Sequence, residues 1–272
     1  MNGTPDFLTR IIEQKRVRLA RAESLRPLGE VREEALSVRR ASRPHALRAA
    51  LESESGFNVI AEIKRASPSL GDIRRDASPA AIALQYEAGG AAAISVLTEE
   101  DHFKGSLEDL REVRAATSLP LLRKDFIVDE WQLYEAAAAQ ADALLLIVAA
   151  LEDATLARLR HITEDELGMD ALVEVHTGAE LRRAASCGAG VIGVNNRNLH
   201  SFEVSLDTSA ELIGDAPPDA LLISESGLRT PADLRRLKSL GYRGFLVGET
   251  LMRAGDPAGA LRALLAGESL AE

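Results

Sequence analysis

Two oppositely charged side chains stand at the end of the first strongly apolar segment of this chain. Glu62 and Lys64 lie two positions apart near the end of the segment 58–64, which is otherwise rich in β-branched residues. On a strand, side chains at positions i and i+2 project from the same face, so this carboxylate and this ammonium point together. Because burying a charge without a partner is costly, the pair is more typical of a functional site than of a core.

Polar groups also end five later apolar segments. Lysines and carboxylates that meet at one place are suited to acid–base catalysis. We expect apolar walls and neighbouring cations to lower the pKa of a lysine there, which would make it a better proton donor near neutral pH. The groups are, in chain order, Lys124, then Glu174, then Asn195 and Arg197, then Glu225 and Ser226, and finally Gly248 and Glu249.

The elements that would position these groups are short apolar segments that alternate with helical ones. Nearly continuous apolar runs of β-forming residues are typical of parallel strands covered by helices. The expected strands are 58–64, 91–97, 120–124, 143–148, 171–175, 191–195, 221–224 and 245–247. The expected helices are 79–88, 106–116, 129–141, 152–159, 178–187, 209–214, 231–240 and 257–265.

Eight strand–helix units predict an α/β fold of the (β/α)8 barrel type, since such barrels usually need about 250 residues and this chain has 272. A doubly wound open sheet is the competing fold, but neither GxGxxG nor GxxxxGK[ST] follows any expected strand. Residues 5–25 predict an amphipathic helix, 26–45 are charged and interrupted by breakers, and 45–51 predict a short helix. We expect a single domain, 1–272, in which residues 1–50 form an N-terminal helical extension over the barrel mouth.

In a barrel, the loops after the seventh and eighth strands commonly hold a phosphate through backbone N–H groups. Gly227 and Gly248 fall in these two loops, and glycine allows the backbone to approach an anion closely. Ser67 and Ser69 can add hydroxyl donors from the first loop. The sequence therefore predicts a phosphate site on one side of the mouth and acid–base groups on the other.

Composition limits the partners of the chain. The formal net charge of −10 argues against nucleic acid or an acidic membrane as a partner, because both need a basic face. Cys187 is the only cysteine, which excludes an intrachain disulfide and suits a reducing compartment. No apolar run approaches the roughly 20 residues that span a bilayer, and the first residues lack the apolar stretch of a signal peptide. We expect a cytoplasmic monomer that acts on a small molecule.

Six motifs, in order, resemble those of the indole-3-glycerol phosphate synthase family: AEIKRASPS, LLRKDFIVDEWQ, VEVH, GVNNRNL, ISESGL and FLVGETLM. The resemblance extends from about residue 5 to 265 and includes the N-terminal helix, which in that family closes over the substrate. It implies conversion of 1-(2-carboxyphenylamino)-1-deoxyribulose 5-phosphate to indole-3-glycerol phosphate, by ring closure, decarboxylation and dehydration, without a metal or an organic cofactor. Residues 26–48 depart from the family pattern, because they are more basic and less aromatic than expected.

The resemblance also implies a role for each polar residue at the strand ends. Lys124 resembles the general acid that protonates the ribulose carbonyl, Lys64 the lysine that holds the substrate carboxylate, and Glu174 the carboxylate that handles protons in the dehydration. Glu62 and Asn195 resemble groups that hold the lysines and the substrate hydroxyls.

The remaining implied roles concern binding. Arg197 resembles a residue near the anthranilate carboxylate, and Phe126, two positions after Lys124, is expected to line the aromatic end of the pocket. The groups that resemble the phosphate cradle are Ser67, Ser226, Gly227, Gly248 and the backbone N–H of Glu249, whose carboxylate must turn away from an anion.

Two other functions remain open from the residues alone. A barrel lysine can also form a Schiff base, as in an aldolase, which borohydride trapping with a sugar phosphate would reveal. A non-catalytic sugar-phosphate binding module is the other, although binding alone does not need two lysines and Glu174 together. We expect Arg123 and Asp125 to face the surface or a helix, and none of the five histidines to be catalytic or to bind a metal.

Overall fold

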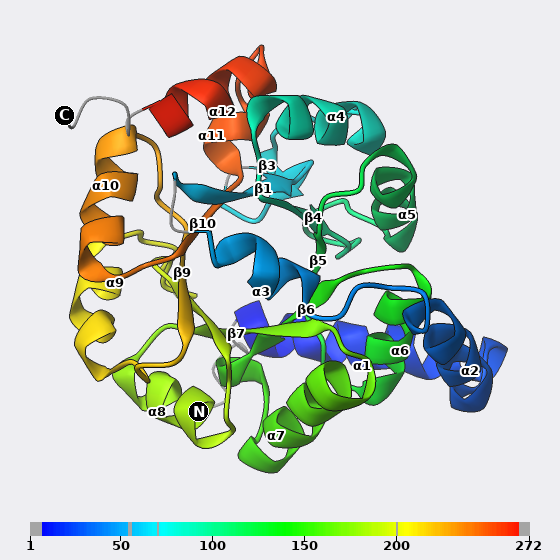
Figure 1. Cartoon of the computed structure of the whole chain (residues 1–272). Coiled ribbons are helices and arrows are strands. Elements are labelled where there is room, and N and C mark those ends of the chain that lie inside the picture. Colours follow the sequence, from blue (N-terminus) through cyan, green and yellow to red (C-terminus); the bar gives the residue numbers. More distant parts are fainter. Residues whose placement is uncertain (1–6, 54–55, 70, 200, 267–272) are drawn as a thin grey trace.

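Eight parallel strands close into a barrel in the computed structural model, which describes residues 7–53, 56–69, 71–199 and 201–266 (Figure 1). Each strand pairs in parallel with its two neighbours, in the order β1-β10-β9-β8-β7-β6-β5-β4 and back to β1. The predicted (β/α)8 barrel is confirmed. The strands are β1 Asn58–Ile63, β4 Ala93–Leu97, β5 Leu121–Lys124, β6 Ala143–Ile147, β7 Asp170–Val175, β8 Val191–Asn195, β9 Leu221–Glu225 and β10 Gly244–Val247.

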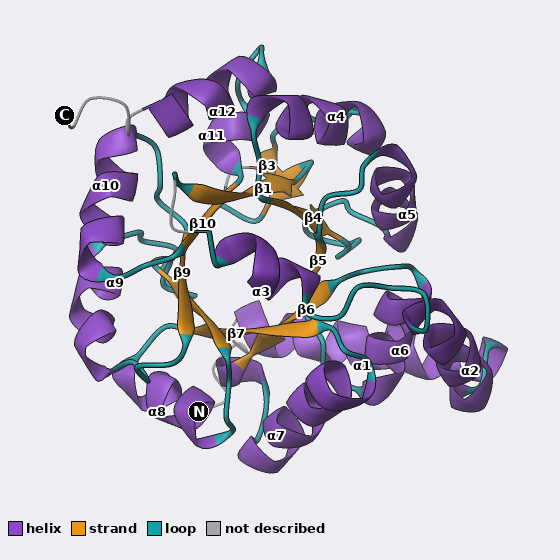
Figure 2. Ribbon diagram, viewed as in Figure 1, coloured by secondary structure: helices purple, strands orange, loops and turns teal. Residues whose placement is uncertain are grey.

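Helices surround the barrel on its outside (Figure 2). They are α4 Pro79–Gly89, α5 Leu107–Ala116, α6 Glu130–Ala138, α7 Asp153–His161, α8 Gly178–Ser186, α9 Asp207–Leu212, α10 Pro231–Leu240 and α12 Pro257–Leu265. Their starts follow local chemistry: Ser78 caps α4 before Pro79, and Thr230 caps α10 before Pro231. The sequence did not predict the short helix α11, Glu249–Met252, or the two-residue ladder between β2, Ala66–Ser67, and β3, Gly71–Asp72.

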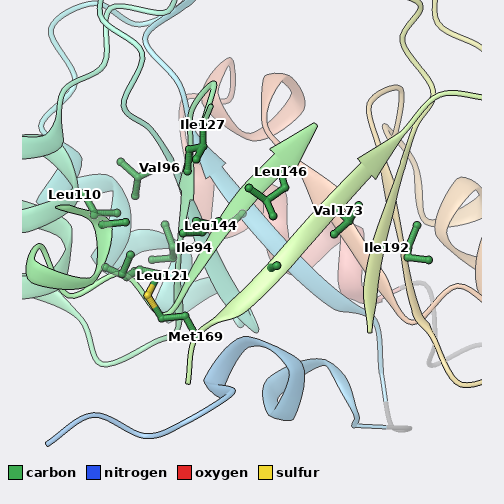
Figure 3. Close-up of a cluster of buried hydrophobic side chains, with 14 of the residues drawn as sticks. Ile94, Val96, Leu110, Leu121, Ile127, Leu144, Leu146, Met169, Val173 and Ile192 are labelled. Atoms are coloured by element: carbon green, nitrogen blue, oxygen red, sulfur yellow. The ribbon is translucent and has the colours of Figure 1, made fainter. Parts of the chain in front are cut away.

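Apolar side chains on the outer faces of the strands pack against these helices (Figure 3). Ile94 and Val96 of β4 belong to this layer, as do Leu144 and Leu146 of β6, so residues two apart share a face as the strand period requires. The layer is built almost wholly from aliphatic residues, because aromatics make up only 4% of the chain. This packing fixes the strands whose ends carry the polar groups.

A second apolar layer fills the barrel interior, and every strand contributes to it. Leu47 and Leu51 of helix α3, Ala46–Leu51, join this layer and are fully buried. In Figure 1, α3 lies across the centre of the strand ring. His45 and the backbone N–H of Arg48 contact Asp170, the first residue of β7, so α3 closes the end of the barrel where strands begin. The opposite end stays open for a site.

Two further helices precede the barrel. Helix α1, Phe7–Leu25, reaches the mouth, where Phe7 and Leu8 line the main cavity. Helix α2, Leu28–Arg39, packs against α6 and lies in the stretch for which the sequence predicted no element. Pro27 precedes α2 as its N-cap, so this proline begins a helix where we expected a break. Residues 5 and 6 of the first expected helix, His200 and both ends of the expected domain 1–272 lie outside the described residues.

Candidate active site

A cavity of about 390 Å³ opens at the carboxyl ends of the strands. Its size falls in the range of small-molecule sites, about 300–1,000 Å³. Side chains or backbone from the ends of β1, β5, β7, β8, β9 and β10 converge on it, and all of the predicted site residues line it. These are Glu62, Lys64, Ser67, Lys124, Phe126, Glu174, Asn195, Arg197, Ser226, Gly227, Gly248 and Glu249.

Lys124 stands at the centre of the cavity between two carboxylates. Its Nζ donates to Glu174 Oε2 at 2.8 Å and lies 3.2 Å from Glu225 Oε2. The two glutamates are almost fully buried, so the Lys124 ammonium offsets part of the cost of burying their charge. Glu225 was noted in the sequence only as a polar strand end and received no role. The structure therefore adds Glu225 to the acid–base set.

Glu62 and Lys64 form the pair that their spacing predicts. Lys64 Nζ donates to Glu62 Oε1 at 2.6 Å, and both side chains line the cavity. The carbonyl of Glu62 accepts a hydrogen bond from the buried hydroxyl of Tyr86 on α4, at 3.0 Å, which fixes the strand end against the outer helix. The site therefore holds two lysines among three glutamates.

Two glycines leave room for these carboxylates. A Cβ at Gly248 would overlap Glu62 Oε1, and a Cβ at Gly193 of β8 would overlap Glu225 Oε1. A larger residue at either position would push a glutamate out of its place. We predicted Gly248 only as part of a phosphate cradle, and Gly193 was not predicted at all. Both leave room for carboxylates at the acid–base end of the cavity, and the predicted phosphate role of Gly248 stays a prediction.

The turn after β9 has an unusual backbone. Ser226 and Gly227 adopt successive positive φ angles of 68° and 83°, and a side chain at Gly227 would run into Val204. Non-glycine residues in this region are strained and concentrate at functional sites. Asn196 holds the turn, because its Nδ2 donates to the carbonyls of Glu225 and Ser226 at 2.9 and 3.1 Å. Sequence reasoning missed this fully buried asparagine, which the adjacent Asn195 obscured.

The loop after β10 leads directly into α11. The first N–H groups of a helix have no partner inside the helix, so they can face an anion. Gly248 is the residue before α11, and both Gly248 and Glu249 line the cavity. Glu249 Oε1 lies 3.3 Å from Arg253 Nε, one turn further along. Its carboxylate is thus engaged away from the backbone N–H, as the sequence required.

Arg197 lies on the other side of the mouth, beside the first loop. Its Nη1 donates to the Phe202 carbonyl at 3.1 Å and lies 3.5 Å from Ser69 Oγ. The Asn195 side chain accepts from the backbone N–H of Arg197 at 3.0 Å, so the two residues turn together from the end of β8. Phe126 lines the same cavity with its ring 6.3 Å from that of Phe103. The same cavity is therefore lined by an apolar wall and by a guanidinium.

The family model of indole-3-glycerol phosphate synthase matches residues 8–264 of the chain. The chain belongs to the indole-3-glycerol phosphate synthase family. A synthase from a Polaromonas species is 48% identical over 95% of this chain and 98% of its own length. The synthases of Mycolicibacterium gilvum and Carboxydothermus hydrogenoformans are 49% and 46% identical, over 97% and 96% of this chain and 95% and 100% of their own lengths.

This membership makes the chain a carboxy-lyase of tryptophan biosynthesis that forms indole-3-glycerol phosphate from a small-molecule substrate. Two solved structures share only the fold with this synthase-family chain. One is a thiamine phosphate pyrophosphorylase from Pyrococcus furiosus, with a TM-score of 0.59, 17% identity and coverage of 83% of this chain and 100% of that one. The other is KGPDC from Streptococcus mutans, with a TM-score of 0.60, 15% identity and coverage of 78% and 97%.

The charges in this synthase-family site differ in one respect from our expectation. Burial alone would favour a neutral Lys124, but the charges of Glu174, Glu225 and Glu62 outweigh it and raise the pKa of Lys124 above its ordinary value. The expectation of a lowered lysine pKa was wrong, because the sequence could not show that carboxylates rather than cations surround Lys124. Lys124 is a fully protonated ammonium in this cavity.

The two glutamates that share Lys124 respond in opposite directions. Burial would raise the pKa of Glu174, but the charges of Lys124 and His176 overcome that effect and hold it below its usual range. Burial raises the pKa of Glu225 to about 7, which Lys124 partly offsets and the charge of Glu174 increases. Of the pair, Glu174 is therefore the carboxylate and Glu225 the group that holds a proton near neutral pH.

Arg123 and Asp125, on either side of Lys124 in the sequence, are buried on the opposite face of the strand end. Arg123 Nη1 donates to the Gln132 carbonyl of α6 at 3.1 Å, so this residue faces a helix, as one of our two alternatives had it. Asp125 Oδ1 lies 2.7 Å from Lys15 Nζ of α1 and its Oδ2 accepts from Thr98. Neither residue faces the surface.

His176 is a second residue that sequence reasoning missed. We expected no histidine to act at the site, but His176 Nε2 lies 3.3 Å from Glu174 Oε1. Within the described ranges, no group of three or more His, Cys, Asp or Glu side chains is placed to hold a metal ion. Among the same residues, no helix has the length and apolarity needed to cross a bilayer.

Proposed function

We propose that the twelve predicted residues that line the cavity bind 1-(2-carboxyphenylamino)-1-deoxyribulose 5-phosphate and catalyse its ring closure, decarboxylation and dehydration. The observation that carries this proposal is the contact between the Lys124 ammonium and the Glu174 carboxylate inside a cavity that has cationic or N–H groups at two separate places. The substrate bears a carboxylate and a phosphate, so it needs such groups at both ends.

In the first step, the aromatic carbon that bears the carboxylate attacks the ribulose carbonyl. Negative charge develops on the carbonyl oxygen, and we assign Lys124 to donate a proton to it. The raised pKa of Lys124 keeps it protonated until that oxygen becomes a strong base. We assign Lys64, Arg197 and Asn195 to hold the substrate carboxylate and hydroxyls, with Glu62 orienting Lys64.

In the second step, the carbon–carboxylate bond breaks, carbon dioxide leaves, and its electron pair restores the aromatic ring. In the third step, the hydroxyl on the new ring leaves with a proton as water, and a neighbouring carbon loses a proton to complete the indole. We assign Glu174 to handle these protons. Because an ionised carboxylate is released as neutral carbon dioxide, each turnover consumes one proton overall.

The phosphate is assigned to the opposite side of the mouth. Ser226 and Gly227 turn their backbone toward the cavity in an unusual conformation, and Gly248 leads into the N-terminus of α11. Ser67 lies across the same opening, with its Oγ 3.5 Å from Ser69 Oγ. Backbone N–H groups at such places favour anions. Phe126 is assigned to the aromatic ring of the substrate.

We further propose that the chain acts as a cytoplasmic monomer, with no nucleic acid or membrane partner. The net charge of −10 and the single cysteine support this. We take residues 1–272 as a single domain in which the first 50 residues extend the barrel, with α1 the part of that extension at the mouth. Light scattering on the purified chain tests the oligomeric state, since a dimer mass would contradict it.

The deciding experiment is a fluorescence assay for the indole product, run on the native chain with the carboxyphenylamino-deoxyribulose phosphate and no added metal. Product formation at a rate proportional to enzyme supports the proposal. Borohydride treatment with the substrate present should trap no adduct, since the assigned lysines act without an imine. Covalent trapping without indole formation would favour an aldolase, and tight binding without product would favour a binding module.

A further inference from the structure

His176 connects Glu174 to the outer helix through a continuous line of contacts. The residue directly follows β7, and its ring lies between two glutamates. Nε2 is 3.3 Å from Glu174 Oε1, and Nδ1 is 3.2 Å from Glu180 Oε2 in the first turn of α8. Glu180 Oε2 also accepts the backbone N–H of His176 at 2.7 Å. Glu174 is left with one oxygen on Lys124 and the other on His176.

The geometry fixes the charge of the imidazole. An imidazole nitrogen that faces a carboxylate must carry a hydrogen to interact favourably, and here both nitrogens face carboxylates, so the ring is doubly protonated. The Nε2 contact is between opposite charges rather than an aligned hydrogen bond. The exposed fraction of the His176 side chain is only 10% and that of Glu174 is 2%, so solvent screens this contact little.

The contacts of the glutamates also single out Glu174. Glu62 contacts Lys64, Glu225 contacts Lys124, and Glu174 contacts Lys124 through Oε2. The imidazolium of His176 supplies a positive charge at the second oxygen of Glu174, Oε1, whereas Glu225 Oε1 has no hydrogen-bond partner. Glu203 and Arg197, which line a second cavity beside His176, carry opposite charges.

We propose that His176 is a positioning residue that keeps Glu174 ionised and orients its carboxylate, while Glu180 holds the imidazole from the opposite side. This inference deepens the proposed function, because it rests on the assignment of Glu174 to proton handling. The alternative is a purely structural role, in which His176 and Glu180 only stabilise the turn between β7 and α8. The backbone hydrogen bond to Glu180 would do that alone and gives the ring no reason to reach Glu174.

The two roles make different predictions for the pKa of His176. Burial alone would lower its pKa, but Glu174 and Glu180 overcome this and raise the pKa of His176 to about 10. Coupling between two charges is reciprocal, so removing the charge of Glu174 must lower the pKa of His176 as much as His176 lowers that of Glu174. A ring that only braced the turn would respond to Glu180 and not to Glu174.

The test is a pH titration of ¹⁵N-histidine-labelled chain by NMR, as native protein and as the Glu174→Gln and Glu180→Gln variants. We expect one imidazole to remain doubly protonated at pH 8 in the native chain, and its pKa to fall by about one unit or more in each variant. His161, an exposed histidine with the same i, i+4 spacing to Asp165, is the internal control and should not respond. A His176 pKa unchanged by Glu174→Gln would overturn the inference.

Turnover gives a second readout. In His176→Gln the pKa of Glu174 rises, so less of the carboxylate is ionised at low pH, and kcat should fall by a larger factor at pH 5.5 than at pH 8.5. An equal loss at every pH would contradict the proposal that His176 keeps Glu174 ionised. His161→Gln is the matched control and should keep the native profile. If the native chain forms no indole product, the proposed function fails, whereas the NMR titration still tests the His176–Glu174 contact by itself.

Discussion

Lys124 Nζ lies 2.8 Å from Glu174 Oε2, although the two residues are 50 positions apart. Lys124 ends β5 and Glu174 lies in β7, the third and fifth strands of the barrel. In such barrels, alternate strands contribute side chains to one layer. Glu62 of the first strand and Glu225 of the seventh complete a layer of four charged residues from the odd-numbered strands. A layer that is usually apolar is thus replaced by acid–base groups above the buried interior.

Replacing Lys124 with alanine removes the proton donor from that layer. We expect Lys124→Ala to lower turnover by at least about 10²-fold, the lower end for a positioned acid, with the chain still folded. The measurement is kcat by indole fluorescence, with circular dichroism to confirm folding. Lys238→Ala is the control, because its ammonium contacts the Gly56 carbonyl at the closed end of the barrel. Native turnover in Lys124→Ala would remove Lys124 from its assigned role.

Glu225→Gln should raise the melting temperature of the chain and lower its turnover. The folded pKa of Glu225 is about 7, above its ordinary value of 4.5. The folded chain therefore holds a proton that the unfolded chain releases, and stability falls as the pH rises from about 4.5 through 7. Glutamine mimics the protonated group, so the variant should melt several degrees higher at pH 8, at about 2–4 °C per kcal/mol. Turnover should fall by about 10²-fold, the lower end for a positioned acid or base, because glutamine can no longer exchange a proton.

The control is the pH dependence of the increase in melting temperature that we expect for Glu225→Gln. Below about pH 4.5, Glu225 is protonated in both the folded and the unfolded chain, so the difference in melting temperature between the native chain and Glu225→Gln should largely disappear. Calorimetry at pH 8 and at the lowest pH at which the chain stays folded measures both limits. A variant that melts lower than the native chain at pH 8 would show that the contact with Lys124 outweighs the cost of burying the charge.

Lys15→Met should detach α1 from the barrel mouth. Lys15 Nζ lies 2.7 Å from the fully buried Asp125, directly after Lys124 in the chain. Removing one partner of a buried pair typically costs about 3–5 kcal/mol, so we expect a loss of about 3 kcal/mol in urea unfolding, since Arg123 still contacts Asp125. KM should also rise, because α1 carries Phe7 to the cavity.

Arg18→Met is the matched comparison for Lys15→Met. Arg18 belongs to the same helix and pairs with Asp101, but both side chains are more than one-third exposed. An exposed pair contributes about 0–1 kcal/mol, so this variant should lose little stability and keep its KM. Equal effects of the two substitutions would mean that the buried pair does not anchor α1.

The strand ends could be predicted because they depend on local patterns. The period of two put Glu62 and Lys64 on one face, and the structure pairs them at 2.6 Å. Apolar runs bounded by polar groups placed all eight strands to within about two residues. Helix α2 was missed because its apolar positions, such as Val31 and Ala35, are few among charges, and its helix is stabilised by packing against α6.

The contacts across the barrel could not be predicted in the same way. Which carboxylates meet Lys124 depends on closure of the sheet and on the stagger of its strands, and neither is encoded in any single segment. The pKa of Lys124 was therefore expected to move in the wrong direction. His176 was dismissed for the same reason, since its proximity to Glu174 requires the turn into α8 to bring Glu180 against the ring.

Gly193 lies in β8, an even-numbered strand of the barrel, and leaves space for Glu225 of the charged layer. A Cβ at Gly193 would overlap Glu225 Oε1 and lie 3.0 Å from Leu172 Cδ1. Gly193→Ala should displace the Glu225 carboxylate from Lys124 and lower kcat, while overpacking costs about 1–3 kcal/mol in unfolding. Gly214→Ala is the control, since no atom lies within 4 Å of the added methyl. If Gly193→Ala kept the kcat of Gly214→Ala, the position of Glu225 beside Lys124 would not matter for turnover.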